Sequence, residues 1–118
     1  MAQQRTPARS ARPESAQGPC CPLYHEAVEL IGKRWTGAIV HVLNGGPMRF
    51  SGLAAAVPQI SDRLLSTRLR ELERRGLLSR AVATGSPVRV EYELTEMGRG
   101  LAPALAELEA WARRWLPG

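Results

Sequence analysis

The sequence predicts a mainly α-helical protein with one small β-hairpin, an α+β class, and three observations support this. Most apolar residues recur every three or four positions, as on one face of a helix. One stretch near position 90 alternates apolar and polar residues, as a half-buried strand does. Glycine and proline separate these segments. With 118 residues, of which 44% are hydrophobic and 5% aromatic, the chain fits one domain with a mainly aliphatic core.

Two helices are expected in the first half of the chain. The first occupies residues 22–32, because Pro22 suits a first helical turn and Gly32 ends or kinks the helix. The second occupies residues 35–44 and is closed by the breaker "NGGP". Its apolar face consists of Trp35, Ile39, Val42 and Leu43.

A helix-turn-helix pair is expected next. The third helix lies in "RFSGLAAAVP", with Leu53, Ala56 and Val57 facing inward. The fourth begins after the capping residue Ser61 and stops at Gly76. Its buried side is formed by Leu65, Leu69 and Leu72. The short "PQI" break between the two helices is the predicted turn.

A hairpin and a final helix complete the predicted fold. Residues 77–83 and 88–94 are strand-like, with "TGSP" as the turn. The second strand alternates, with Val88, Val90, Tyr92 and Leu94 on one side. Thr95 caps a last helix over residues 96–116, which Pro103 is expected to bend or loosen. Helices followed directly by a hairpin give a winged helix-turn-helix arrangement, here with a C-terminal dimerisation helix.

The termini and compartment follow from composition. Residues 1–19 are rich in Arg, Pro, Ser, Gln and Ala without apolar periodicity, so we expect a disordered basic arm. This arm is either an inert tail or a non-specific DNA contact. Residues 20–118 form the expected DNA-binding and dimerisation domain. No apolar stretch resembles a signal peptide or a membrane span, so we expect a cytoplasmic, nucleoid-associated protein without a membrane partner.

The charge of the fourth helix points to an anionic partner. The chain has a formal net charge of +5, and all but one of its sixteen Lys and Arg residues are arginine. A GC-rich genome would explain the arginine count, so position is the better evidence. The face opposite the leucines lacks a carboxylate and consists of Arg63, Ser66, Thr67, Arg70 and Arg74. It spans about 16 Å, a length that the DNA major groove accepts. The alternative is a solvated helix whose arginines pair with Glu71 and Glu73.

Other residues are candidate contacts to the DNA backbone. Ser61 and the first amides of its helix are suited to a phosphate. Arg49 and Ser51, at the start of the third helix, are further candidates. Ser86 and Arg89 in the hairpin are expected to follow the minor groove or the backbone, although Arg89 is equally an outward residue of a strand.

Other classes of function find little support. The chain shows no glycine-rich phosphate loop and no nucleophile beside a base, so an enzyme is not expected. Cys20, Cys21 and His25 could begin a metal site, but a closed zinc site needs about four ligands. Beyond these three, only His41 remains, and Asp or Glu ligands would have to complete the set, so we expect no metal and no cofactor. The remaining alternative is a winged-helix module that binds an acidic protein. A steep salt dependence of duplex binding would separate the two.

Several motifs together resemble the HxlR family of bacterial winged-helix transcription regulators. They are "CP", "ELIGKRW", "GGPMRFSGL", "ISDRLLSTRLRELERRGLL" and "VRVEYELTEMGRGL", followed by an apolar last helix. The resemblance covers residues 21–115. It implies a homodimer on an inverted-repeat operator, with a recognition helix in each major groove, a wing alongside, and repression or less often activation of nearby genes.

The resemblance also implies a candidate thiol sensor. Some family members sense electrophiles, quinones or oxidants at the "CP" position, which is Cys21 here, with Cys20 beside it. A helix N-terminus stabilises a thiolate and so activates it. The effector would be a small molecule or an electrophile. The alternative is that Cys21 is a small, partly buried apolar residue.

The last helix carries an apolar stripe that is long for so small a domain. We expect this stripe to pack against the first helix of a second copy and so to form a homodimer. The candidate dimerisation residues are Leu23, Ala27, Leu101, Leu105, Leu108, Trp111 and Trp115. The alternative, which accounts for part of the stripe, is packing on its own hairpin and second helix.

Overall fold

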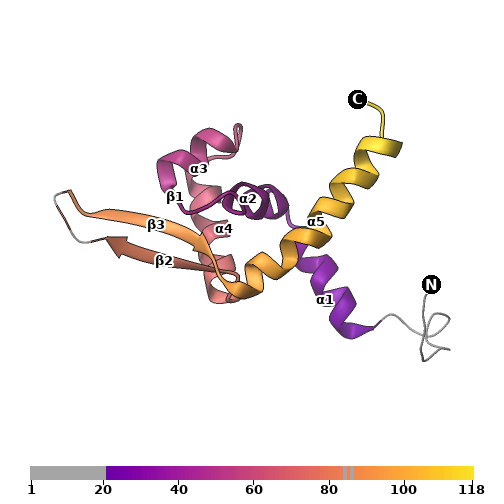
Figure 1. Ribbon diagram of the computed structural model, residues 1–118, viewed down its shortest axis with the longest axis horizontal. Helices are drawn as coiled ribbons and strands as arrows, with labels where there is room; N and C mark the ends of the chain where they lie inside the picture. The colour runs from indigo at the N-terminus through magenta and orange to yellow at the C-terminus, as the bar shows by residue number, and fades with distance from the viewer. Residues whose placement is uncertain (1–20, 84, 86) are drawn as a thin grey trace. The chain divides into compact units, whose positions relative to one another are not determined.

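The computed structural model describes residues 21–83, 85 and 87–118 (Figure 1). The chain divides into two units, Met1–Ile31 and Gly32–Gly118, and each is described by itself. The expected arm of residues 1–19, together with Cys20 and Ser86, lies outside the described residues.

The first unit contributes helix α1, Pro22–Ile31, as predicted. The carbonyl of Cys21 accepts a hydrogen bond from the backbone N–H of His25 at 2.9 Å, so Cys21 is the last residue before the helix. None of the α1 residues is buried. Leu23, with 75% of its surface exposed, is the most open of several apolar residues on this helix.

The second unit is a winged helix-turn-helix domain, which confirms the predicted class. Its elements are α2 (Thr36–Leu43), β1 (Met48–Arg49), α3 (Phe50–Ala56), α4 (Asp62–Arg74), β2 (Leu78–Ala83), β3 (Arg89–Leu94) and α5 (Glu96–Trp115). Strands β2 and β3 form the antiparallel wing, and Figure 1 shows it projecting from the helices of this unit.

Strand β1 was not predicted, so the expected two-stranded hairpin is in fact a three-stranded sheet. The strand order is β1-β3-β2. Met48 lies opposite Tyr92 and Arg49 lies opposite Glu91, in antiparallel register. A two-residue strand is too short to show alternation, and it exists here because β3 offers a free edge beside it.

The core joins α2, α3, α4 and the base of the wing. Helix α2 contacts α3, α5 and β3. The buried apolar residues are Ile39, Val40, Leu43, Leu53, Val57, Ile60, Leu65, Leu69, Leu72, Leu77, Leu78 and Leu94. Two inward assignments were wrong in detail. Val40 is fully buried where the sequence favoured Val42, and Ala56 is exposed.

The turn and the ends of α4 have clear local causes. Gln59, in the turn, has a left-handed backbone with φ of 77°. The Ser61 side chain accepts a hydrogen bond from the Leu64 N–H at 3.0 Å and so caps the helix. At the other end, Gly76 has φ of +85°. The N–H groups of Gly76 and Leu77 return to the carbonyls of Glu73 and Leu72, which is a Schellman ending.

The wing meets α5 at a tightly packed corner. Leu94 is buried, but the predicted alternation fades toward the tip, where Val88 is 65% exposed. The Thr95 hydroxyl accepts a hydrogen bond from the Gly98 N–H and caps α5. Helix α5 continues through Pro103 for 20 residues. No helix in the described residues is both long enough and apolar enough to cross a membrane.

Candidate nucleic-acid interface

Helix α4 has one side held firmly by the core. Leu65, Leu69 and Leu72 are almost completely buried, as their spacing predicts. Burying each such side chain contributes about 1.5–3 kcal/mol, so the rotation of the helix about its axis is well determined. The opposite face is consequently directed away from the core.

This outer face carries unpaired positive charge. Arg63, Arg70 and Arg74 are exposed, while Ser66 and Thr67 are partly covered. Within the described part of the chain, no ion pair or hydrogen bond engages the guanidinium groups of these three arginines. The alternative in which they pair with Glu71 and Glu73 therefore does not describe them.

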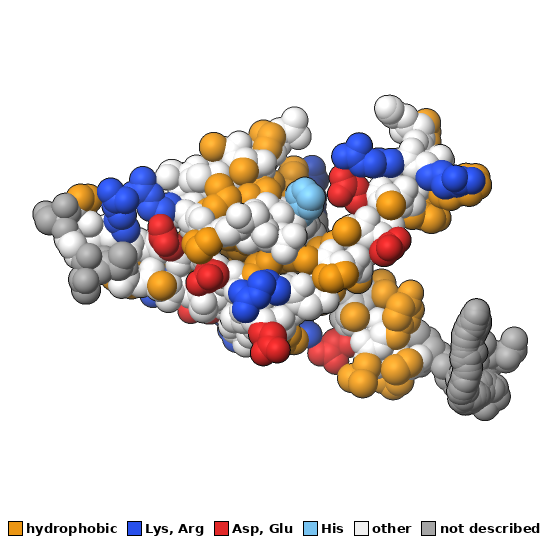
Figure 2. Space-filling model, viewed as in Figure 1, with side chains coloured by type: hydrophobic (Ala, Val, Ile, Leu, Met, Phe, Trp, Pro, Cys, Tyr) orange, Lys and Arg blue, Asp and Glu red, His pale blue; other side chains and the backbone are white. Residues whose placement is uncertain are grey.

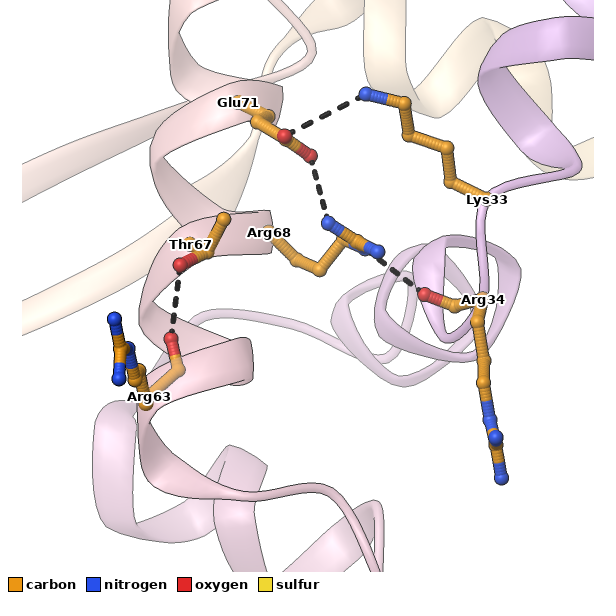
Figure 3. Close-up of polar contacts among 6 residues, drawn as sticks. All are labelled: Lys33, Arg34, Arg63, Thr67, Arg68 and Glu71. Carbon is orange, nitrogen blue, oxygen red and sulfur yellow. Dashed lines mark hydrogen bonds and ion pairs between the residues drawn. The ribbon is translucent and has the colours of Figure 1, made fainter.

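Glu71 is neutralised from the other side of the helix. Its carboxylate lies 3.2 Å from Arg68 and 3.5 Å from the Lys33 Nζ (Figure 3). Arg68 also donates from Nε to the carbonyl oxygen of Arg34 at 3.0 Å. Figure 3 shows Arg63 and Thr67 on the side of α4 opposite to this network. The acidic residue and its partners are thus kept away from the outer face.

Two of the predicted hydroxyls, those of Thr67 on α4 and of its capping residue Ser61, have a local role. The Thr67 hydroxyl donates to the Arg63 carbonyl at 3.0 Å, so its proton is used within the helix. The Ser61 hydroxyl is occupied as an acceptor by the cap. Ser61 is exposed at the N-terminus of the helix, where the first backbone N–H groups remain available to an anion.

The other predicted DNA contacts lie on neighbouring elements. Arg49 is the last residue of β1 and directly precedes α3, and Ser51 is in the first turn of α3; both are exposed. Arg89 is exposed at the start of β3, opposite Ala83. Figure 2 shows Lys and Arg side chains gathered over the outer part of the wing.

A polar pocket of about 250 Å³, here called the junction pocket, lies between α4 and the wing. Its lining residues are Ser66, Leu69, Arg70, Glu73, Arg80 and Tyr92. The sequence did not indicate Arg80 or Tyr92 as site residues. Their place opposite each other depends on the register of β2 against β3, which no local pattern reveals.

The candidate sensor thiol lies at the start of α1. Cys21 is exposed and immediately precedes Pro22. Its neighbour Cys20 is outside the described residues.

Helix α5 has both a packed side and an open side. Leu101 and Leu105 are half-buried, in keeping with the contact between α2 and α5. Leu108, Trp111 and Trp115 are exposed, Trp115 to 62%. Figure 2 shows hydrophobic side chains along α5 and, separately, on α1, where Leu23 and Ala27 are exposed. Packing within its own domain therefore accounts for the first half of the stripe, and the second half is left exposed.

A shallow apolar pocket of about 280 Å³ lies between α2 and α5. Its lining residues are Gly37, His41, Leu105, Leu108, Glu109 and Ala112. Hydrogen bonding from Arg113, followed by the charge of the same residue, holds the pKa of Glu109 below its usual value. Glu109 is therefore ionised near neutral pH, at the rim of an otherwise apolar surface.

Comparison with known proteins gives one family. Residues 30–118 match the family described as HxlR-like helix-turn-helix. A similar curated relative is the uncharacterized HTH-type transcriptional regulator YvaP of Bacillus subtilis. It is 46% identical over 100 residues, which cover 85% of this chain and 93% of YvaP.

Two redox-related regulators have similar solved structures. The reduced form of the transcriptional regulator YodB of Bacillus subtilis is 42% identical with a TM-score of 0.76, covering 83% of this chain and 96% of that one. YodB has also been solved after diamide treatment and with quinone bound. The redox regulator HypR in its oxidized form is 34% identical with a TM-score of 0.76, covering 83% of this chain and all of that one.

Proposed function

The chain belongs to the HxlR-like helix-turn-helix family, and from this premise we propose that it is a sequence-specific repressor that binds an inverted-repeat operator as a homodimer. It is a helix-turn-helix transcriptional regulator and not an enzyme. We also propose that the protein acts in the cytoplasm, at the nucleoid.

The observation that carries the proposal is the exposed, unpaired arginine face of α4. Arg63, Arg70 and Arg74 are exposed, and no carboxylate of the described residues pairs with them. Arginine forks match guanine edges and phosphates. A duplex supplies both, and the major groove is about 12 Å wide, enough for one helix.

The flanking residues are assigned to the DNA backbone. The proposed phosphate contacts are Arg49, Ser51 and Ser61, with Ser86 and Arg89 on the wing. Such contacts fix the orientation of the protein on the duplex. The outer face of α4, with Arg63, Ser66, Thr67, Arg70 and Arg74, is assigned to the groove, where it supplies the base contacts and reaches the phosphates at the groove border.

The homodimer is assigned to the open apolar surfaces. Leu23 and Ala27 on α1, and Leu108, Trp111 and Trp115 on α5, are exposed. We assign them, with Leu101 and Leu105, to the contact with a second copy. An inverted repeat whose half-sites lie about one helical turn apart requires this twofold symmetry.

Footprinting of the DNA upstream of the gene, followed by affinity measurements, tests the proposal. Arg63→Ala is expected to weaken operator binding by about 1–3 kcal/mol and to relax base preference at one position of each half-site. Arg113→Ala is the matched control, because it removes the same charge from an exposed α5 residue that pairs with Glu109. No footprint, or equal losses in both variants, would contradict the assignment of α4 as the recognition helix.

The alternative partner, an acidic protein, predicts a different result. A wild-type protein that binds duplex DNA weakly and with little salt dependence would favour it. Neutralising several phosphates instead makes the affinity fall steeply with salt, by a slope of about −0.9 per contact.

The proposed signal is a thiol-reactive molecule that acts on Cys21. With a quinone, the thiolate Sγ adds to a ring carbon, one C–S bond forms, and the ring takes up a proton to become a hydroquinone. With diamide, the Cys21 thiols of two subunits form a disulfide, and their two electrons and two protons reduce the N=N bond to a hydrazine. The exposure of Cys21 ahead of α1 and the similarity to YodB and HypR support this part of the proposal.

Measuring operator affinity with and without quinone or diamide tests whether the Cys21 thiol is the sensor. The wild-type protein is expected to lose affinity, Cys21→Ser to be insensitive, and Cys20→Ser to respond like the wild type. An identical response of wild type and Cys21→Ser would exclude Cys21 as the sensor.

A further inference from the structure

The junction pocket between α4 and the wing points to a specific ligand. We propose that it holds one backbone phosphate of bound DNA, with Arg70 and Arg80 as the cationic partners and Ser66 and Tyr92 as hydroxyl donors. This assignment rests on the proposed function, because it requires α4 to enter a major groove. It adds Arg80 and Tyr92, on the wing, to the DNA contacts.

The wing side of the pocket is built by strand register. Arg80 on β2 lies directly opposite Tyr92 on β3. Residues opposite each other in an antiparallel pair project from the same face of the sheet and lie about 5 Å apart. The central strand β3 is held by β1 on its other edge, where Met48 pairs with Tyr92. The two side chains therefore share one face of a supported sheet.

The helix side is a single stripe of α4. Ser66, Leu69, Arg70 and Glu73 are spaced three, one and three residues apart, which places them along one side of the helix. Leu69 is buried beneath them and contributes to the floor. Because α4 contacts β2, the stripe faces the wing, and polar groups from two elements converge on one cavity.

The charge of the pocket favours an anion. Arg70 and Arg80 contribute two positive charges and Glu73 one negative charge. In the residues that the structure describes, neither guanidinium forms an ion pair, and the Glu73 carboxylate does not pair with either of them. Two arginines thus border one cavity with hydrogen-bond donors unused, the arrangement in which arginine binds phosphate strongly.

Docking geometry brings a phosphate to this place. A helix with its side chains is about 10–12 Å across, close to the width of the major groove of about 12 Å. The two phosphate strands that border the groove must therefore run along the flanks of α4. The wing lies along one flank, so one strand passes between α4 and the wing. A volume of about 250 Å³ is several times that of a water molecule, about 30 Å³, so a phosphate and bridging waters fit.

The test measures the affinity of the full chain for a short duplex of arbitrary sequence as a function of salt. Arg80→Ala is expected to weaken binding equally on any sequence and to make the salt slope shallower by about 0.9. The ratio of wild-type affinity to Arg80→Ala affinity therefore falls about threefold between roughly 50 and 200 mM salt. Arg113→Ala, with the same change in net charge on α5, is expected to leave the slope unchanged.

Two further variants separate ligand binding from a structural role. Glu73→Gln removes the only carboxylate among the residues that line the pocket. It is expected to tighten binding about two- to threefold, the repulsion of two like charges roughly 6–10 Å apart in water. Tyr92→Phe keeps the ring but removes the hydroxyl, so it should weaken binding with an unchanged slope. A loss of folding would not raise affinity, so tighter binding by Glu73→Gln supports the assignment, and unchanged or weaker binding counts against it.

A competition series identifies the source of the phosphate. If the pocket takes the DNA backbone, inorganic phosphate should inhibit duplex binding of wild type more than chloride does at equal ionic strength, and Arg80→Ala should abolish this difference. Phosphate that binds the wild-type protein and is not displaced by saturating duplex would overturn the assignment in favour of a free anion. If wild type fails to bind any duplex, the proposed function itself is wrong. If wild type binds with a steep slope that Arg80→Ala leaves unchanged, only the pocket assignment is wrong.

Discussion

At the scale of single residues, Gly98 determines how closely α5 approaches the end of α4. It is buried in the first turn of α5, where a Cβ atom would overlap the carbonyl oxygen of Leu77 and lie 3.0 Å from a methyl carbon of Leu94. Leu77 also accepts a hydrogen bond from the N–H of Thr95, which holds its carbonyl in place. The obstacle is therefore backbone and cannot rotate away.

We predict that Gly98→Ala destabilises the protein by about 1–3 kcal/mol, the usual cost of overpacking. Gly100→Ala is the matched control on the same helix, since nothing lies within 4 Å of its Cβ position. It should instead be neutral or stabilising by up to about 1 kcal/mol, because alanine is the better helix former. Urea unfolding measures both, and a stable Gly98→Ala protein would show that this corner can open.

The arginines of α4 divide into two kinds by contact rather than by sequence. Arg68 is only 17% exposed and has partners on α4 and in the segment before α2, whereas the guanidinium of Arg63, on the face opposite the leucines, is unengaged by any described residue. Arg68 thus stabilises the fold, whereas Arg63 on the same helix remains available to a ligand.

At the scale of elements, the contact between α4 and the segment before α2 depends on Arg68. Its guanidinium reaches both the Arg34 carbonyl and the Glu71 carboxylate, and Glu71 in turn faces Lys33 (Figure 3). This small network spans a sequence separation of 38 residues. It fixes α4 to the segment before α2, on the side opposite the proposed DNA face.

We predict that Arg68→Ala lowers the free energy of unfolding by about 1–2 kcal/mol, because charge-assisted hydrogen bonds of a mostly covered side chain are lost. Lys33→Ala should cost much less, about 0–0.5 kcal/mol, since that side chain is 52% exposed and 3.5 Å from its partner. Thermal and urea denaturation of both variants give the comparison. Equal losses would mean that the contact to the Arg34 carbonyl contributes nothing.

The wing gains its stability from its neighbours. Two strands alone are marginal in water, yet β3 is flanked by β1 as well as β2 and contacts α2, α3 and α5. This support ends before the tip, where Val82 and Val88 are exposed. The base of the wing is thus a fixed wall for the junction pocket.

At the scale of the whole molecule, α5 leaves several large apolar side chains exposed along one side, which marks a candidate interaction surface. Leu108, Trp111 and Trp115 are each more than half exposed, and Leu108 and Trp115 are seven residues apart on one side of the helix. A second copy would remove this surface from water.

We predict that Leu108→Asp combined with Trp115→Asp converts a dimer into a monomer with much weaker operator binding, because two charges would be buried in the interface. Ala106→Asp with Ala110→Asp adds the same charges on the opposite side of α5, where both alanines are exposed, and should remain dimeric. Sedimentation velocity distinguishes the species. An unchanged sedimentation profile of the first variant would count against α5 as the interface.

Much of the architecture could be predicted from local patterns in the chain. The bounds and rotation of α4 follow from three leucines, the Ser61 cap and the Gly76 stop, all of which act within a few residues. The caps of α5 and the strand-like alternation near Leu94 have the same local character. Periodicity and capping report short-range physics, so a single sequence contains them.

The features that the sequence missed all depend on contacts between distant residues. Strand β1 needs the edge of β3, Arg80 becomes a site residue only through its register against Tyr92, and Glu71 is neutralised by Lys33. The burial of Val40 in place of Val42 depends on how α2 packs on its neighbours. The sequence by itself determined the helices, their faces and the excess of positive charge. Only the tertiary structure decided which charges remain unpaired, because pairing depends on distances between elements that no local pattern encodes.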